Sequence, residues 1–245
     1  MAISLQGGNV AISQVYTQVE RVDPAVCEKA RKVSVADIHE AMGPNARSAL
    51  MTPRMRPLNR GLSVAGPAVT AFCSPADNLM MHRALFLARP GDVLVVVCAA
   101  ENSGAQWGDV AANYAQAKGL AGVVVQGCIR DTDTLERMRF PVWSTLVSPA
   151  RPAKSGHGTV NAPVSCDGVI VHAGDLVVAD GDGVVVVPAD QAAEVIEASL
   201  QPMERDEKAI RAVASDGHPW HLTGAADIYA QLDGEEMDAP YRRPA

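Results

Sequence analysis

The chain has 245 residues, of which 48% are hydrophobic, 20% charged and 4% aromatic. This composition is ordinary for a soluble globular protein, and the length suits one sizeable domain or two small ones. The formal net charge of −7 argues against a nucleic-acid partner, because phosphate backbones are bound by basic surfaces.

Two further features of the sequence bear on the compartment. No apolar run approaches the length of a membrane span, and the first residues lack a basic segment followed by an apolar run. The five cysteines are dispersed without paired spacing, which is typical of reduced thiols and argues against a thiolate zinc site. We therefore expect a cytoplasmic protein that does not engage a membrane.

The predicted elements alternate along the middle of the chain. The first forty-odd residues indicate helices, and Gly43-Pro44 ends the stretch VADIHEAMG. Short Val-rich runs bounded by Gly, Pro or Asp then predict strands, and charged amphipathic stretches between and after them predict helices. The predicted strands cover 64–72, 92–98, 122–126, 169–171, 176–179 and 183–188, and the predicted helices cover 78–87, 110–118, 132–138 and 191–213.

The order of these elements predicts the fold class. Strands alternate with helices in the middle of the chain, but they cluster without helices between Gly158 and Pro188. This pattern favours a layered α/β fold with a mixed sheet over a pure doubly wound sheet. We expect one domain over residues 1–215 that includes a C-terminal helical extension, followed by a Gly/Pro-rich, acidic arm over 216–245.

The stretch from 107 to 133 carries the strongest chemical signal. Gly108-Asp109 precedes a predicted helix, so Asp109 is expected near a helix N-terminus, whose free N–H groups attract carboxylates. Lys118-Gly119 ends that helix, and a buried strand leads to Arg130-Asp131. Open α/β sheets bind their ligands at the C-terminal ends of strands. The strand–helix–strand unit should therefore bring Asp109, Arg130 and Asp131 to the same edge of the sheet.

Two carboxylates beside one guanidinium predict an oxygen-ligand site for Mg²⁺ or Mn²⁺ together with an anionic substrate. The guanidinium of Arg130 can bind a carboxylate through two parallel hydrogen bonds, which a lysine cannot do. The alternative from spacing alone is that Arg130-Asp131 forms a solvated turn or a structural ion pair.

Twenty residues separate Asp109 from Arg130, and Asp131 follows at once. This spacing resembles the Asp-(twenty residues)-Arg-Asp signature of the class II pyruvate aldolases that act on 4-hydroxy-4-methyl-2-oxoglutarate and 4-carboxy-4-hydroxy-2-oxoadipate. The wider superfamily is the RraA-like proteins, which include regulators of ribonuclease E. The resemblance extends from about residue 35 to 188, including RPGDVLVVV and GLAGVVVQGCIRDTDTL, and it implies the RraA-like swivelling β/β/α fold. The pair His39-Glu40 and the stretch MRP at 55–57 look more like the aldolase branch.

The resemblance also implies roles for individual residues. Asp131 would hold the metal, Asp109 would orient its water shell, and Arg130 would contact the pyruvyl carboxylate or the enolate oxygen. The N–H groups of Val110 and Ala111 would bind the pyruvyl carboxylate. Related aldolases complete the site with an acidic residue from the C-terminal helix of a neighbouring subunit, for which Glu207 is the first candidate and Glu204 the second.

Three residues before the main motif are candidates for contacts to the far end of the substrate. His39 could approach a distal carboxylate, although a surface pair with Glu40 explains it equally well. Arg54 and Arg56 could bind a dicarboxylate or tricarboxylate, and solvated loop positions are an equal alternative for both.

The implied reaction is a Mg²⁺- or Mn²⁺-dependent retro-aldol cleavage. It would release pyruvate plus oxaloacetate from 4-carboxy-4-hydroxy-2-oxoadipate, or two pyruvates from 4-hydroxy-4-methyl-2-oxoglutarate, with decarboxylation of oxaloacetate as a side activity. Family members form homotrimers or homohexamers with sites between subunits and serve the catabolism of aromatic compounds. The alternatives are a non-catalytic RraA-like regulator that binds a ribonuclease, or a related decarboxylase. Relatives usually have Gly-Glu and two leucines where this chain has Gly108-Asp109-Val110-Ala111, which leaves the exact substrate open.

Overall fold

The computed structural model describes residues 13–215 and 217–240 and divides the chain into two compact units, Met1–Leu200 and Gln201–Ala245. Within those described ranges, no helix has both the length and the apolar character needed to cross a bilayer. The first unit contains the sheets, and the second continues from helix α7 into two short helices, α8 and α9.

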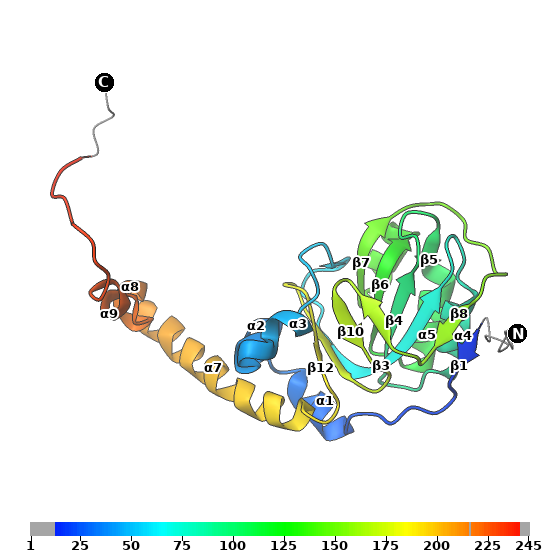
Figure 1. Ribbon diagram of the computed structural model, residues 1–245, viewed down its shortest axis with the longest axis horizontal. Coiled ribbons are helices and arrows are strands. Elements are labelled where there is room, and N and C mark those ends of the chain that lie inside the picture. Colours follow the sequence, from blue (N-terminus) through cyan, green and yellow to red (C-terminus); the bar gives the residue numbers. More distant parts are fainter. Residues whose placement is uncertain (1–12, 216, 241–245) are drawn as a thin grey trace, which may run out of the picture. The chain divides into compact units, whose positions relative to one another are not determined.

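The main sheet has the strand order β1-β8-β3-β4-β6-β7-β2, and β5 pairs with the end of β6. Its centre is parallel, because β3, β4, β6 and β7 run in the same direction, as Figure 1 shows. The outer pairings of β3 with β8 and of β2 with β7 are antiparallel, so the sheet is mixed as predicted. The strands are β1 (Gln14–Val15), β2 (Arg56–Pro57), β3 (Val64–Cys73), β4 (Val93–Cys98), β5 (Ala105–Trp107), β6 (Gly122–Ile129), β7 (Val142–Val147) and β8 (Gly158–Val160).

A second β layer comes from the stretch in which predicted strands cluster without helices. Strand β3 joins the two layers, since residues 64–67 pair with β11 and residues 68–73 pair with β4. Two antiparallel pairs, β9 with β10 and β11 with β12, make up the rest of this layer. These strands are β9 (Val164–Cys166), β10 (Val169–Val171), β11 (Leu176–Ala179) and β12 (Val184–Val187).

Side-chain alternation along the buried strands builds the layers of the core. In β4, Leu94 and Val96 pack with helices α4, α5 and α6, whereas Val93, Val95 and Val97 pack against the second β layer. The far side of that layer packs against α1, α2, α3 and the start of α7. The helical elements are α1 (Pro24–Ala30), α2 (Val35–Ala41), η1 (Gly43–Asn45), α3 (Ala46–Ala49), α4 (Leu79–Leu87), α5 (Asp109–Lys118), α6 (Thr132–Met138), α7 (Ala192–Val213), α8 (Pro219–Leu222) and α9 (Ala225–Tyr229).

The prediction of a layered α/β fold with a mixed sheet and a C-terminal helix is confirmed. The helical interpretation of the N-terminal region is wrong for residues 13–23, which contain β1 and no helix, and residues 1–12 lie outside the described part. The short strands β1, β2, β5, β8 and β9 and the strand β7 were not predicted. The proposed boundary between a domain over 1–215 and an arm over 216–245 stays a prediction.

Candidate functional site

The parallel pairing of β5 with β6 joins the two halves of the predicted motif. The N–H of Arg130 donates a hydrogen bond to the carbonyl of Trp107 at 3.0 Å. Gly108 then caps the start of α5, whose first residue is Asp109. The helix start and the strand end therefore lie side by side at the C-terminal edge of the parallel strands, where α/β sheets place their ligands. The predicted convergence of Asp109 with Arg130 and Asp131 is present.

Asp131 is held in a constrained position between the other members of this group. Its backbone is left-handed, with φ 58° and ψ 34°, which costs a non-glycine residue about 1 kcal/mol or more. Its Oδ2 accepts the N–H of Asp109 at 3.3 Å and lies 3.3 Å from Nε of Arg130. Gly108 permits this approach, because a Cβ there would lie 2.6 Å from the same oxygen. The carboxylate thus bridges a helix N-terminus and a guanidinium.

The first turn of α5 does not offer all its N–H groups to a ligand. The side chain of Asp109 accepts the N–H of Val110 at 2.7 Å, and the N–H of Ala112 already bonds the carbonyl of Gly108. The N–H of Ala111 has no hydrogen-bond partner among the described residues. Of the two backbone donors predicted to bind a carboxylate, Ala111 is therefore the available one, and Val110 becomes available only if Asp109 turns away.

Two cavities open beside Asp109, which lines both. The acidic cleft has a volume of about 370 Å³ and is lined by Asp109, Asp131, Thr132, Asp133, Thr134 and Arg137. The cationic cleft has a volume of about 380 Å³ and is lined by Asn78, Met81, His82, residues 105–111, Arg130, Arg151, Pro152 and Lys154. Burial lowers the pKa of His82 and the charge of Lys154 lowers it further, so this imidazole is neutral near pH 7. The site thus has a carboxylate-rich side and a cation-rich side.

The acidic cleft has the donor chemistry of a Mg²⁺ or Mn²⁺ site. Its side chains offer carboxylate and hydroxyl oxygens, which these hard cations prefer, and it contains no histidine or cysteine. Within residues 13–215 and 217–240 no group of three or more Asp, Glu, His or Cys forms a complete metal cage. Mg²⁺ commonly keeps several waters and uses one or two protein carboxylates, so Asp131 and Asp109 fit this mode of binding.

Three predicted site residues are not among those that line the two clefts. Glu207 lies on α7 in the second unit, where Arg211 donates to it at 3.4 Å, and Glu204 lies on the same helix. His39 lies in α2 and lines a separate cavity with Arg47, which shares no residue with either cleft. A single chain does not test a role of Glu207 or Glu204 in a neighbouring subunit's site, so both roles stay predictions. The predicted contact of His39 with a distal carboxylate also stays a prediction.

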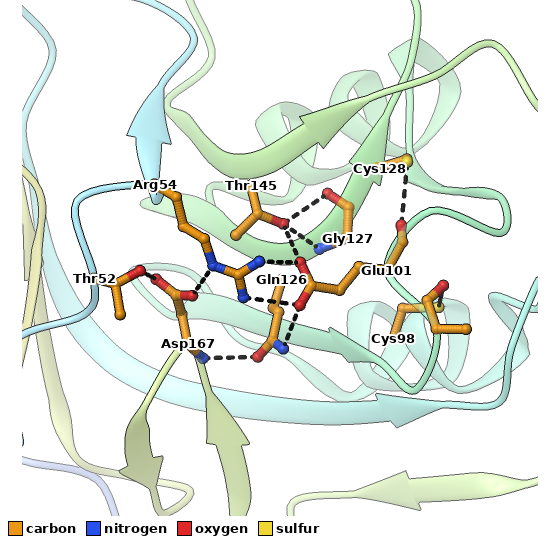
Figure 2. Close-up of polar contacts among 10 residues, drawn as sticks. Thr52, Arg54, Cys98, Glu101, Gln126, Gly127, Cys128, Thr145 and Asp167 are labelled. Atoms are coloured by element: carbon orange, nitrogen blue, oxygen red, sulfur yellow. Dashed lines mark hydrogen bonds and ion pairs between the residues drawn. The ribbon is translucent and has the colours of Figure 1, made fainter.

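Arg54 is engaged by carboxylates of its own chain, as Figure 2 shows. Its two terminal nitrogens donate to Glu101 at 2.9 and 2.8 Å, and its Nε donates to Asp167 at 2.6 Å. Burial raises the pKa of Glu101, but hydrogen bonds from Arg54, Gln126 and Thr145 outweigh it and leave that pKa below its ordinary value. Arg54 therefore ties the loop after β4 to the turn between β9 and β10, and its guanidinium is not free for a substrate carboxylate.

Sequence reasoning missed the residues that form the wall of the cationic cleft. Arg151 and Lys154 follow β7, whose C-terminal end meets the same sheet edge as that of β6, but β7 itself was not predicted. Asn78 occupies the N-cap position of α4, but its side chain makes no capping hydrogen bond, and the N–H of Leu79 bonds the carboxylate of Asp77 at 2.8 Å. The sequence signal that could have identified Arg151 and Lys154 is the occurrence of two basic residues just after a strand in an acidic chain.

Comparisons with known proteins identify one family. A family model described as RraA-like, Aldolase/RraA, matches residues 35–186. A Halalkalibacterium halodurans protein named "Putative 4-hydroxy-4-methyl-2-oxoglutarate aldolase" is 36% identical over 68% of this chain and 79% of its own length. A Burkholderia mallei protein of the same name is 34% identical over 62% of this chain and 92% of its own length.

Solved structures share the fold. Streptomyces coelicolor RraAS2, described as an unusual member of the RNase ES inhibitor RraA family, is 32% identical, with a TM-score of 0.69 over 78% of this chain and 98% of that one. An uncharacterized Pseudomonas syringae protein, 24% identical, has a TM-score of 0.73 over 83% of this chain and 99% of that one.

Proposed function

Because the chain belongs to the RraA-like family, we propose that it is a divalent-metal-dependent lyase that cleaves a 4-hydroxy-2-oxo acid by a retro-aldol reaction. The proposed substrates are 4-carboxy-4-hydroxy-2-oxoadipate, which gives pyruvate and oxaloacetate, and 4-hydroxy-4-methyl-2-oxoglutarate, which gives two pyruvates. The names of the relatives from Halalkalibacterium halodurans and Burkholderia mallei support this choice. The observation that carries it is the convergence of Asp109, Arg130 and Asp131.

The reaction breaks the C3–C4 bond, removes the proton of the C4 hydroxyl and leaves an electron pair on the pyruvyl fragment. Negative charge then develops on the 2-oxo oxygen, and in this proposal the guanidinium of Arg130 stabilises it. A Mg²⁺ or Mn²⁺ ion held by Asp131 and Asp109 would supply Lewis-acid stabilisation of that same charge. The N–H of Ala111 at the start of α5 holds the pyruvyl carboxylate.

The proton steps involve the clefts on both sides of Asp109. Its carboxylate lines both cavities, so it can accept the proton of the C4 hydroxyl through a water molecule that it orients. Protonation of the pyruvyl fragment at C3 then releases pyruvate. Loss of carbon dioxide from oxaloacetate leaves the same electron pair at C3, so oxaloacetate decarboxylation is the proposed side activity.

The assembly belongs to the same proposal. A homotrimer or homohexamer would bring the α7 helix of one subunit to the acidic cleft of another, with Glu207, or next Glu204, as the additional acid. The observation behind this choice is that Glu204 and Glu207 both belong to α7, a helix of 22 residues.

A second candidate is a regulator that binds a ribonuclease without catalysis. The relative from Streptomyces coelicolor supports it, because that protein is described as a member of an RNase ES inhibitor family and is 32% identical to this chain. The two candidates differ in turnover: an aldolase releases pyruvate from a 4-hydroxy-2-oxo acid, whereas a regulator forms a stable complex with a ribonuclease and releases none.

The test is a coupled pyruvate assay with the two proposed substrates and with oxaloacetate. EDTA should abolish turnover, and Mg²⁺ or Mn²⁺ should restore it. Replacing Asp131 with Ala should lower kcat/KM by about 100-fold or more, because it removes the main carboxylate from the acidic cleft. The exposed Asp190→Ala is the matched control and should behave as wild type. Near-normal turnover in Asp131→Ala would overturn the site, and absence of turnover with capture of a ribonuclease would favour the regulator.

A further inference from the structure

Two basic side chains of the cationic cleft make no direct ion pair with the described residues. Arg151 and Lys154 both line it, and neither has an ion pair or hydrogen bond with a side chain among the described residues. The chain as a whole is acidic, with a net charge of −7, and other basic side chains such as Arg21 and Arg54 are paired with carboxylates. Two unpaired cations beside Arg130 make this cavity a local anion site in an acidic protein.

The loop that carries the two cations is fixed to the body of the fold. Asp77 is only 3% exposed, and its Oδ2 accepts the N–H groups of Ser155 and Gly156 at 2.6 and 2.7 Å. On the other side of Arg151, the carbonyl of Ala150 accepts the N–H of Ala105 at 2.9 Å. The backbone is thus anchored before Arg151 and after Lys154, so both side chains start from defined positions.

Buried polar atoms in the same wall also lack partners. Among the described residues, Asn78 Oδ1, Gln106 Oε1 and Trp107 Nε1 are buried and make no hydrogen bond. These residues are 6%, 0% and 1% exposed, and all three line the cationic cleft. Buried polar atoms in folded proteins are paired in the great majority of cases. Acceptors together with an indole donor suit a ligand that carries both a hydroxyl and a carboxylate.

We propose that Arg151 and Lys154 bind the carboxylate that the substrate carries at C4, and that they select acids with this group over acids without it. This inference rests on the proposed function. Arg130 lines the cleft and contacts Asp131, so the pyruvyl end lies at Arg130 and the far end lies towards Arg151. The planar guanidinium of Arg151 suits bidentate binding, and Lys154 adds a second charge. Arg54, another sequence candidate for this role, is bound by Glu101 and Asp167 of its own chain.

The test compares two substrates that differ in the C4 carboxylate. For 4-hydroxy-4-methyl-2-oxoglutarate, which has it, Arg151→Ala should lower kcat/KM by about 10- to 100-fold, because a charge-assisted contact is lost. For 4-hydroxy-2-oxopentanoate, which lacks it, the same variant should stay within about twofold of wild type. Lys154→Gln should show the same selectivity with a smaller loss. The exposed Arg83→Ala is the matched control and should change neither substrate.

A binding measurement on the metal-free protein separates this proposal from the proposed function. Propane-1,2,3-tricarboxylate titrated by calorimetry should bind wild type more tightly than Arg151→Ala, and the difference should shrink as salt rises. If wild type releases no pyruvate from either acid, the proposed function fails and the titration alone decides on the cleft. The assignment of Arg151 to the C4 carboxylate is overturned if wild type and Arg151→Ala bind propane-1,2,3-tricarboxylate equally. It is also overturned if Arg151→Ala loses the same factor in kcat/KM on both substrates.

Discussion

Adding one methyl group at Gly108 should disturb the site while leaving the fold intact. Gly108 has φ −164° and ψ −173°, an extended conformation that any residue adopts, so Gly108→Ala carries no backbone strain. The new Cβ would lie 2.6 Å from Oδ2 of Asp131 and 3.3 Å from Nε of Arg130. Ordinary contact begins at 3.4 Å, so the carboxylate must move by roughly 0.8 Å.

The expected magnitudes differ for stability and for activity. The displaced atom is the end of a side chain that is 35% exposed, so it can turn aside for about 0.5–1.5 kcal/mol, the cost of an off-rotamer angle. For a domain of this size that lowers Tm by roughly 2–5 °C. A misplacement near 1 Å in a catalytic group lowers the rate by about 100-fold, and we expect a loss of roughly 30- to 100-fold in kcat/KM.

The assay is pyruvate release with Mn²⁺, together with thermal unfolding and the affinity for Mn²⁺. Gly181→Ala is the matched control, because its Cβ would meet nothing within 4 Å and its φ is not left-handed. A folded Gly108→Ala protein with kcat/KM and Mn²⁺ affinity within twofold of wild type would refute the reasoning, because the positions of Asp131 and Arg130 would then not control turnover.

The remaining predictions concern two buried carboxylates. Burial raises the pKa of Asp77, but three backbone N–H donors outweigh it and leave that pKa below its ordinary value of 3.8. The stabilisation from the charged Asp77 is therefore complete above pH 3.8 and is lost as the pH falls through the lowered pKa of the folded protein. The amide NMR signals of Ser155 and Gly156, which donate to this carboxylate, should shift as it is protonated. The absence of any shift down to pH 2 would contradict this prediction. In Arg21→Ala, the carboxylate of Asp92, which is 1% exposed, loses the two hydrogen bonds that Arg21 donates at 2.8 and 2.9 Å. The free energy of unfolding, measured in urea, should therefore fall by about 2–4 kcal/mol. A fall of less than about 1 kcal/mol would contradict a stabilising role for that ion pair.

Local pattern was sufficient to predict the framework of the site. The Val-rich runs predicted β3, β4 and β6, because a strand buried on both faces is continuously apolar. The Gly stop at Gly119, left-handed at φ 81°, ended α5 as expected. The Asp-(twenty residues)-Arg-Asp spacing measures one helix plus one strand, so it also predicted that Asp109 and Arg130 would meet.

Local pattern was insufficient where an element depends on distant partners. Strand β5 has three residues, too few for a detectable period, and it exists because it pairs with the end of β6. Arg54 seemed free for a substrate because its partners, Glu101 and Asp167, lie far along the chain. The role of Glu207 depends on an assembly that one chain does not contain.

The sequence by itself determined the fold class, the helix and strand that carry Asp109 and Arg130, and the character of the acidic cleft, because these follow from periodicity and short spacing. Only the tertiary structure decided that Arg151 and Lys154 form the wall beside Arg130. Their loop is held by Asp77 and by backbone hydrogen bonds to residues far along the chain. Such long-range bonds leave no periodic trace in the loop's own residues, so they become visible only when the chain is folded.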